Sequence, residues 1–298
     1  MTTDTSIGQP ATGGWREWTR HPFINTVVSA RMHLVDSLFT YRMGIPASPL
    51  GRLLKYPAIA FERVSLRFGA ATQDILFQRY YRLHGLHYGP TGRGYQAISS
   101  GSREDQLSRY RGQVSRLAYF AQNFSDILPY ADGDTFADLG CGTGQSIRFL
   151  VATYPSSVVI GADISADAVA LVRECEPSEN VQLTVGDMRD EEFLSRVLSP
   201  PIDHIVMSHV FALIFGQSML KTRSLRQSFI DRAVARSRKS VIILDNFGKR
   251  GECNITIEQK QRALVTDDVM SYFDNHVEGR AFMVASARSQ AIMFVHNK

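Results

Sequence analysis

The residues best suited to ligand chemistry lie in the stretch TFADLGCGTGQ, residues 135–145. An acidic residue, Asp138, precedes three glycines at alternate positions, Gly140, Gly142 and Gly144. Glycines let the chain turn sharply and let a ligand lie against bare backbone. An apolar strand before this turn and an amphipathic helix after it predict a nucleotide-type site at the carboxyl edge of a parallel sheet.

Two further acids and a histidine follow later predicted strands. Asp163 ends the second strand, where a carboxylate can accept hydrogen bonds from both hydroxyls of a ribose. Asp187 follows the third strand beside the apolar Met188, and Ser208 and His209 follow the fourth. Each acid taken alone could instead be a helix N-cap or a turn residue, because Asp is favoured at both.

Apolar strands alternate with amphipathic helices from about residue 130 onward. We expect strands at 136–139, 157–163, 181–185, 202–208 and 240–245, a terminal hairpin of 281–285 and 291–296, and helices at 146–154, 165–175, 191–198 and 217–238. This alternation predicts a three-layer α/β domain with a mainly parallel sheet. Before it, residues 102–124 predict one long helix with Ser102 as N-cap, which places Arg109 and Arg116 on one face.

The part of the chain before this helix is expected to be different in character. Residues 1–14 are rich in Thr, Gly and Pro and predict a disordered tail. Residues 15–101 predict a helical cap that forms the substrate region, and residues 102–298 form the binding domain. Helices are expected at 23–40, at 53–68 from near Pro57 onward, and at 70–84, with an irregular loop at 84–101.

Composition limits the class of protein. The chain has 298 residues, of which 44% are hydrophobic and 21% charged, which is ordinary for a globular protein. No apolar run approaches the roughly 18 residues that span a bilayer, and the N-terminus has no secretion signal pattern. The three cysteines, Cys141, Cys175 and Cys253, are far apart and odd in number. They predict a reducing cytoplasm and neither disulfides nor a zinc site, and no other cluster has metal-ligand spacing.

The net charge of +4 is unevenly distributed. Residues 1–130 carry a net charge of +7, and residues 131–298 carry −3. A basic excess can face an anionic substrate, nucleic acid or a membrane surface. No block of five or six like charges occurs, so a solvated helical surface is the favoured interpretation and nucleic acid an unfavoured partner.

Together these motifs resemble the class I S-adenosylmethionine (SAM) dependent methyltransferases. ADLGCGTG is similar to their first motif, GADIS and GDM to their second- and third-strand acids, DHIVMSHVF to their fourth-strand segment, and AFMVA and AIMFVHN to their last two strands. The resemblance covers about residues 130–298. It implies a three-layer Rossmann-like fold whose seven-stranded sheet is mostly parallel with an antiparallel last strand, preceded by the helical cap.

The resemblance also implies SAM as cofactor, S-adenosyl-L-homocysteine as product, and a role for individual residues. The implied cofactor-binding residues are Asp138, Gly140, Cys141, Gly142 and Gly144 around the methionine part, Asp163 at the ribose, Ile164, Asp187 and Met188 at the adenine, Ser208 after the fourth strand, and Tyr95 with Arg116 or Arg109 closing over the cofactor. A dinucleotide enzyme is the disfavoured alternative, because Asp138 would repel a pyrophosphate.

Methyl transfer needs a base only where the acceptor must lose a proton. His209 is the best-placed candidate for this catalytic role, because a neutral imidazole can accept a proton near pH 7. The alternative, which is the more common one for a histidine after a strand, is a hydrogen-bonded structural group. His84, His87, Tyr88 and Asp245 are further candidates.

The sequence leaves three hypotheses about function. The first is a methyltransferase acting on an O or N acceptor of a small molecule or glycan. The second is a nucleic-acid or protein methyltransferase, for which no acceptor signature such as NPPY is present. The third is a non-catalytic subunit that uses its N-terminal helices to bind a partner. The same helices could form a homodimer.

Overall fold

The fold is known from a computed structural model, which describes residues 56–57, 60, 77, 102–112, 115–199, 202–216, 219–245, 247, 257–274, 279–285 and 290–296. The chain divides into two compact units, residues 1–69 and 70–298. The expected tail, most of the cap and loop, and the candidates Tyr95, His84, His87 and Tyr88 lie outside the described residues. The domain boundaries at 14 and 101 therefore stay predictions.

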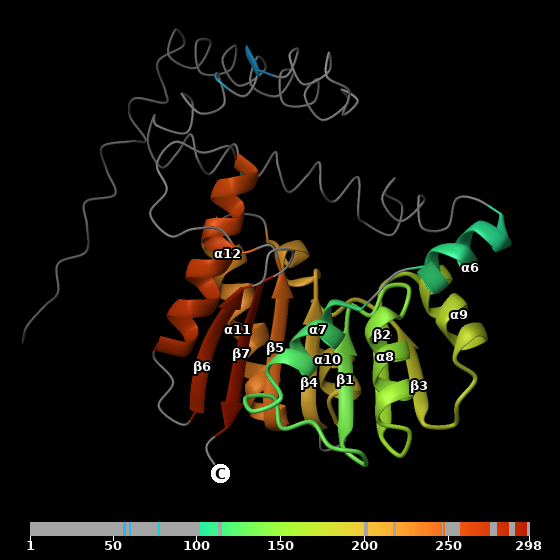
Figure 1. Ribbon diagram of the computed structural model, residues 1–298. Helices are drawn as coiled ribbons and strands as arrows, with labels where there is room; N and C mark the ends of the chain where they lie inside the picture. The colour runs from blue at the N-terminus through green and yellow to red at the C-terminus, as the bar shows by residue number, and fades with distance from the viewer. Residues whose placement is uncertain are drawn as a thin grey trace, which may run out of the picture. The chain divides into compact units, whose positions relative to one another are not determined.

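The described helices and strands of the second unit alternate along the chain (Figure 1). Their order is α6 (Arg103–Gly112), α7 (Arg116–Asn123), β1 (Thr135–Leu139), α8 (Gln145–Thr153), β2 (Val158–Asp163), α9 (Ala166–Cys175), β3 (Val181–Val185), α10 (Glu191–Val197), β4 (Ile202–Ser208), the 3₁₀ turn η1 (Phe211–Leu213), α11 (Met219–Arg236), β5 (Ser237–Asp245), α12 (Ile257–Asp274), β6 (Gly279–Ala285) and β7 (Gln290–His296).

The strands form one seven-stranded sheet in the order β3-β2-β1-β4-β5-β7-β6. The pairs among β1 to β5 are parallel, and β7 runs antiparallel to both β5 and β6. The sequence-based prediction of a mainly parallel sheet with an antiparallel last strand is confirmed. Because β1 lies between β2 and β4, the turns that follow these three strands meet at one edge of the sheet.

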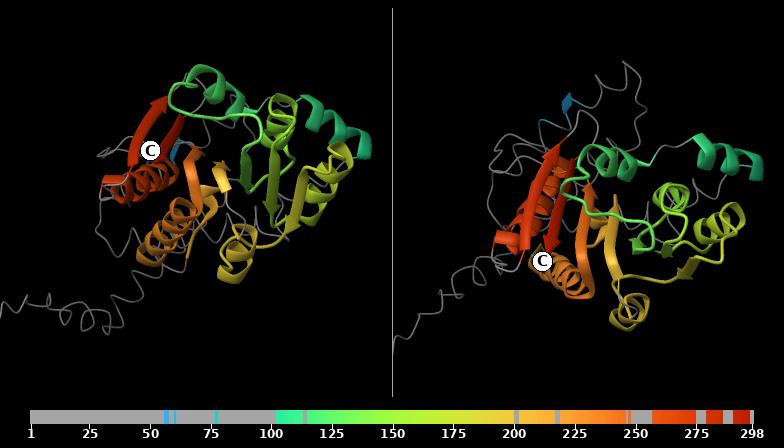
Figure 2. Two further views of the ribbon diagram at one scale, coloured as in Figure 1. Left: turned by 90° about the horizontal axis from the view of Figure 1, so that it is seen from below. Right: turned by 60° about the horizontal axis from the view of Figure 1, so that its bottom comes forward.

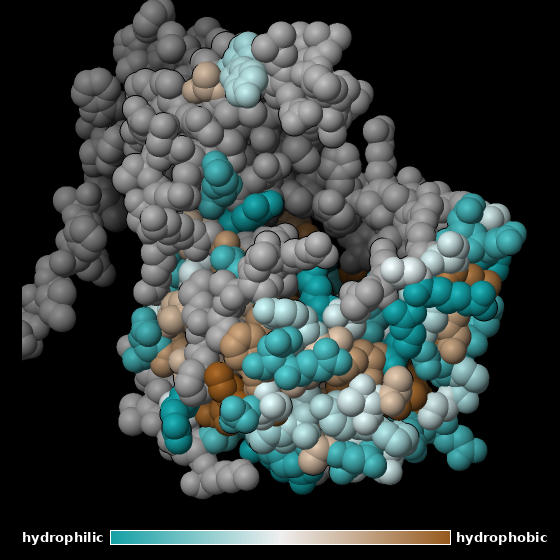
Figure 3. Space-filling view, in the orientation of Figure 1, coloured by the Kyte–Doolittle hydropathy of each residue, from teal (hydrophilic) through white to brown (hydrophobic). Residues whose placement is uncertain are grey.

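Helices cover both faces of the sheet, and each face has its own apolar core (Figure 2). On one face, α7 and α8 bury Leu117, Phe120, Ile147 and Leu150. On the other face, α10, α11 and α12 pack apolar residues against the alternate side chains of the same strands. On the face seen in Figure 3, hydrophilic and hydrophobic described residues are interspersed over α7 and its neighbours.

Two elements differ from the sequence-based predictions. The long helix expected over 102–124 was wrong, because Ser115 has an extended backbone (φ −62°, ψ 128°) and separates α6 from α7. Arg109 and Arg116 therefore belong to different helices and share no face. The cap of α6 was predicted correctly: Ser102 Oγ accepts the N–H of Asp105, whose Oδ2 accepts the N–H of Ser102.

The second difference is α12, an 18-residue helix that the sequence did not predict. Its buried residues include the polar Thr266 and Asp268 among the apolar Val265 and Val269. These polar residues obscure the helical spacing of the apolar ones, so the sequence pattern alone does not reveal the buried face.

A buried polar network lies between β4, β5 and the residue before β1. The imidazole of His204 is completely buried, with Nδ1 2.8 Å from Ser240 Oγ and Nε2 2.9 Å from Asp134 Oδ2. Lys239 contacts the other oxygen of Asp134. Burial lowers the pKa of His204 to about 4, although Asp134 opposes this shift. His204 is therefore neutral in the folded protein near pH 7.

We predict that this network makes the protein sensitive to acid. An unfolded chain protonates His204 near pH 6.5, but the folded protein does so only near pH 4, so the free energy of unfolding falls as the pH drops between these values. The full shift corresponds to about 3 kcal/mol at most. Urea unfolding at pH 7.5, 6 and 5 measures this free energy. Between pH 7.5 and 5 it should fall less for His204→Gln than for the wild type. Equal losses in the two proteins would contradict the prediction.

Candidate functional site

The glycine turn after β1 is fastened to the end of β2. The N–H groups of Gly140 and Cys141 both donate to the carbonyl of Ala162, at 2.8 and 3.0 Å. The N–H of Gly142 donates to Asp163 Oδ2 at 2.8 Å. These bonds fix the path of the turn against the neighbouring strand. Cys141 contributes its backbone here, while its thiol is buried and burial raises its pKa.

The three glycines differ in how closely other residues pack around them. All have positive φ angles, of 80°, 50° and 80° for Gly140, Gly142 and Gly144. A Cβ at Gly140 would lie 2.6 Å from Val210, and one at Gly144 would lie 2.6 Å from Val172, so both positions are glycine for packing reasons. A Cβ at Gly142 would meet none of the described residues within 4 Å. Gly142 is thus the glycine that leaves open space beside the backbone.

Asp138 is a buried acid with an unpartnered oxygen. Its side chain lies on β1 and is 1% exposed, and its Oδ1 has no hydrogen-bond partner among the described residues. Burial, followed by the negative charge of Asp163, raises the pKa of Asp138 to about 7. A buried polar atom without a partner is costly, so this oxygen is suited to a ligand that brings a donor or a positive charge.

Asp163 organises the turns on both sides of it. Its Oδ2 accepts the N–H of Gly142, and its Oδ1 accepts the N–H of Ser165 at 2.8 Å. Ser165 is the N-cap of α9, as predicted, and accepts the N–H of Ala168. Burial raises the pKa of Asp163, although its backbone hydrogen bonds oppose this. The role as a turn residue is therefore real, and the role toward a ribose stays a prediction.

The acid after β3 has a partner that sequence reasoning missed. Asp187 accepts hydrogen bonds from Arg189 Nε, 3.0 Å from each of its two oxygens, and from the N–H of Arg189 at 2.9 Å. Burial opposes ionisation, but Arg189 outweighs it and lowers the pKa of Asp187. Met188 is half-buried against the apolar core, and Ile164 is also half-buried. Their roles toward an adenine stay predictions.

The segment after β4 places His209 at the same edge of the sheet. His209 has a φ of 56°, uncommon for a residue other than glycine, and its N–H donates to the carbonyl of Leu244 at 2.7 Å. Its ring Nε2 contacts the guanidinium of Arg116, from the first turn of α7. Burial lowers the pKa of His209, Arg116 lowers it further, and the nearby Asp245 opposes both. The imidazole is therefore neutral near pH 7.

The structure thus brings together two groups of predicted residues. One group surrounds the glycine turn after β1. The other lies at the end of β4, where Ser208 is the last residue of the strand, His209 follows it and Arg116 of α7 contacts the His209 ring. The packing of Gly140 against Val210, the residue after His209, joins the two. Arg109 lies on α6, and its side chain is outside the described residues.

Among the described residues, no group of three or more His, Cys, Asp or Glu side chains is placed to hold a metal ion. In the part of the chain that the structure describes, no helix is both long enough and apolar enough to cross a membrane.

Known proteins resemble this chain at the site. Residues 136–223 match a family model described as a methyltransferase domain. A trans-aconitate 2-methyltransferase of Rhodopseudomonas palustris (strain BisB18) is 42% identical over 53 residues, which are 18% of this chain and 21% of that protein. The enzyme of the same name from Azoarcus sp. (strain BH72) is 37% identical over 62 residues, 21% of this chain and 24% of that protein. The chain thus spans about a fifth to a quarter of the length of these curated relatives.

A solved structure shares the fold more widely. The plantazolicin methyltransferase BpumL, solved in complex with S-adenosylhomocysteine, aligns over 75% of this chain and 97% of its own, with a TM-score of 0.50 and 10% sequence identity. At that identity the likeness concerns the fold. The chain is therefore similar to methyltransferases in two respects: residues 136–223 match a methyltransferase domain, and the sheet with the strand order β3-β2-β1-β4-β5-β7-β6 belongs to a fold shared with this enzyme.

Proposed function

We propose that the protein is a SAM-dependent methyltransferase that acts on an O or N atom of a small molecule or glycan. Two observations together carry the proposal: the buried oxygen of Asp138 has no partner among the described residues, and Gly142, in the turn that follows β1, leaves open space beside the backbone. When bound, SAM supplies a methyl group on a positively charged sulfur, which is a good leaving group. The protein then has mainly to align the reactants and exclude water.

The residues around the glycine turn fit the two ends of such a cofactor. Asp138 offers a carboxylate to the ammonium of the methionine part, and the absence of a side chain at Gly142 gives room next to the backbone. Asp163 keeps the turn in place through the N–H of Gly142, and lone pairs of the same carboxylate remain for ribose hydroxyls.

His209 is the proposed base for acceptors that lose a proton. Its lowered pKa keeps the ring neutral, as a base requires. The contact with Arg116 occupies Nε2, so proton transfer at that nitrogen requires the guanidinium to move. A long, positively charged side chain such as Arg116 can exchange this contact for the carboxylate of the methionine part.

The acceptor class has support from the relatives. Two of the matched proteins are named for methylation of trans-aconitate, a small molecule. The expected acceptor pocket of residues 15–101, a homodimer through the N-terminal helices and a cytoplasmic location stay predictions. A nucleic-acid acceptor remains the alternative suggested by the basic first 130 residues.

We predict that Gly142→Ala weakens SAM binding by more than tenfold, because the new Cβ fills the open space beside the turn. Calorimetry with purified protein measures the dissociation constant. Gly133→Ala is the matched control, because Gly133 also has a positive φ, of 90°, and no described residue within 4 Å of where its Cβ would lie, but it precedes β1. A substitution at Asp163 would be a less specific test, because the Asp163 side chain also accepts two backbone hydrogen bonds that hold the turns.

The control variant should bind SAM as the wild type does, with a similar cost in thermal stability to that of Gly142→Ala. Equal SAM affinity in both variants would show that Gly142 does not face the cofactor. Absence of SAM binding by the wild-type protein would overturn the proposed function itself.

We further predict that SAM affinity depends on the ionisation of Asp138. Because the pKa of Asp138 is about 7, the carboxyl is protonated below that pH and loses its attraction for an ammonium. Affinity should fall as the pH is lowered from 7.5 to 5.5, by about tenfold per pH unit at the acid end. In Asp138→Asn, affinity should be low and nearly independent of pH over this range. A wild-type profile as flat as that of the variant would contradict the prediction.

A further inference from the structure

Arg226 is a completely buried charged side chain that the proposed cofactor site does not use. It lies on α11, and its exposed fraction is 0%. A buried guanidinium is costly unless its donors are satisfied, and such residues are almost never found inside a protein without partners. The partners of Arg226 therefore indicate what the side chain is for.

Those partners join α12 to the turn that follows His209. Arg226 Nε donates to the carbonyl of Ile214 at 3.0 Å, and Nη2 donates to the carbonyl of Ala212 at 3.3 Å. Nη1 donates to Asp268 Oδ2 at 3.1 Å, and the guanidinium carbon lies 6.0 Å from the centre of the Phe211 ring. One side chain thus holds two carbonyls of the turn and a carboxylate of the neighbouring helix.

The same turn is fastened to β5 on its other side. The N–H of Ala212 donates to Asp245 Oδ2 at 2.9 Å, and the N–H of His209 donates to the carbonyl of Leu244 at 2.7 Å. Ala212 is therefore bonded through its N–H to the strand and through its carbonyl to Arg226. His209, with its positive φ, begins the segment that these bonds hold.

We propose that Arg226 and Asp268 form a clamp that positions the segment 209–214 and so holds the His209 ring beside Arg116. Arg226 is a positioning residue that acts through the backbone of the η1 turn. Only the catalytic meaning of this clamp rests on the proposed function, because the clamp itself is a property of the fold. It extends the list of functional residues to two helices outside the glycine motif.

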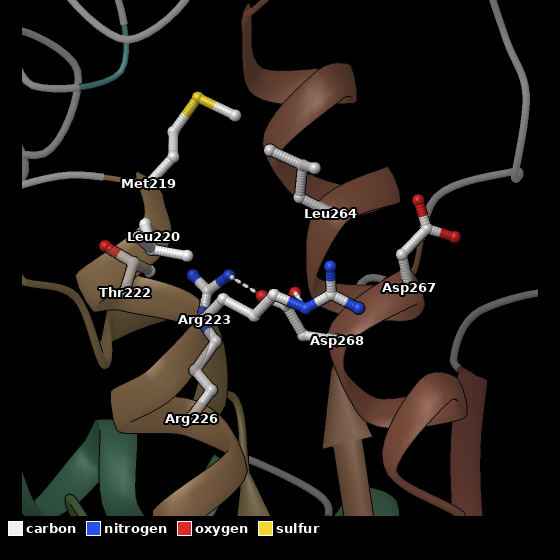
Figure 4. A pocket seen from close by; sticks show the side chains of 8 residues that line it. All are labelled: Met219, Leu220, Thr222, Arg223, Arg226, Leu264, Asp267 and Asp268. Atoms are coloured by element: carbon white, nitrogen blue, oxygen red, sulfur yellow. Dashed lines mark hydrogen bonds and ion pairs between the residues drawn. The ribbon is translucent and has the colours of Figure 1, made fainter. Parts of the chain in front are cut away.

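A second arginine on α11 provides a natural comparison. Arg223 Nε lies 3.5 Å from the other oxygen of Asp268, and its side chain is half exposed. Arg223, Arg226 and Asp268 are among the residues that line a pocket of about 340 Å³ between α11 and α12 (Figure 4). Arg223 shares the carboxylate with Arg226 but has no bond to the turn among those described above.

The test removes both charges of the clamp, in the double variant Arg226→Met with Asp268→Leu. Replacing both partners of a buried ion pair by apolar residues is often neutral for stability, whereas removing one leaves an unpaired charge. Arg223→Met is the matched control, because it removes an arginine from the same carboxylate but keeps Arg226 and Asp268 intact. Neither SAM nor an acceptor is needed for the measurements.

Two measurements report on the turn. In the double variant, amide hydrogen exchange at Ala212 and Ile214 should be at least tenfold faster than in the wild type. The pKa of His209, followed by the NMR shift of its ring, should rise toward 6.5. The ring then leaves its buried place beside Arg116, and both burial and Arg116 lower this pKa, whereas the nearby Asp245 raises it. Arg223→Met should match the wild type in both.

A folded double variant with wild-type exchange and His209 titration would overturn the clamp. If the double variant does not fold, Arg226→Lys decides, because an ammonium keeps the charge but lacks the planar fork that reaches three acceptors. Wild-type behaviour of His209 in a folded Arg226→Lys protein would also overturn the proposal. The SAM affinity of the variants, measured in parallel, should stay within threefold of that of the wild type. If the wild-type protein does not bind SAM, this result counts against the proposed function and not against the clamp.

Discussion

The hydrogen bonds that tie the glycine turn to the end of β2 are the constraint on which the site depends. Two N–H groups of the turn share the carbonyl of Ala162, and a third reaches Asp163. They direct the chain back over the sheet edge, so that α8 starts beside the open space at Gly142. Parallel pairing of β1 with β2 is what brings donor and acceptor within reach.

The place of β1 between β2 and β4 gives the site two halves with different supports. On the β2 side, a carboxylate, Asp163, holds the turn by accepting backbone N–H groups. On the β4 side, a guanidinium, Arg226, holds the turn by donating to backbone carbonyls. In both halves a buried ionisable side chain bonds to backbone groups of a loop that lies beyond the strand ends, where the regular strand pairing stops.

Other buried ionisable side chains have hydrogen-bond partners. His204 is neutral and lies between Asp134 and Ser240, and Arg226 pairs with Asp268. In the part of the chain that the structure describes, Asp138 is the exception, since one of its oxygens is buried without a partner and its pKa rises to about 7. The unpaired oxygen lowers the stability of the folded protein, and a bound positively charged group would offset this cost. The destabilising feature is therefore the one that the proposed activity uses.

The sequence alone determined the strands, their mainly parallel arrangement, the cap at Ser165 and the positions of Asp138, Gly142, Asp163 and His209, because each follows from local spacing of apolar, glycine and acidic residues. It could not reveal α12, whose buried Asp268 hides the helical pattern, nor the break at Ser115. Only the tertiary structure decided which glycine faces open space and which arginine is buried, because both depend on contacts between segments far apart in the chain, such as Val210 with Gly140 and Asp268 with Arg226.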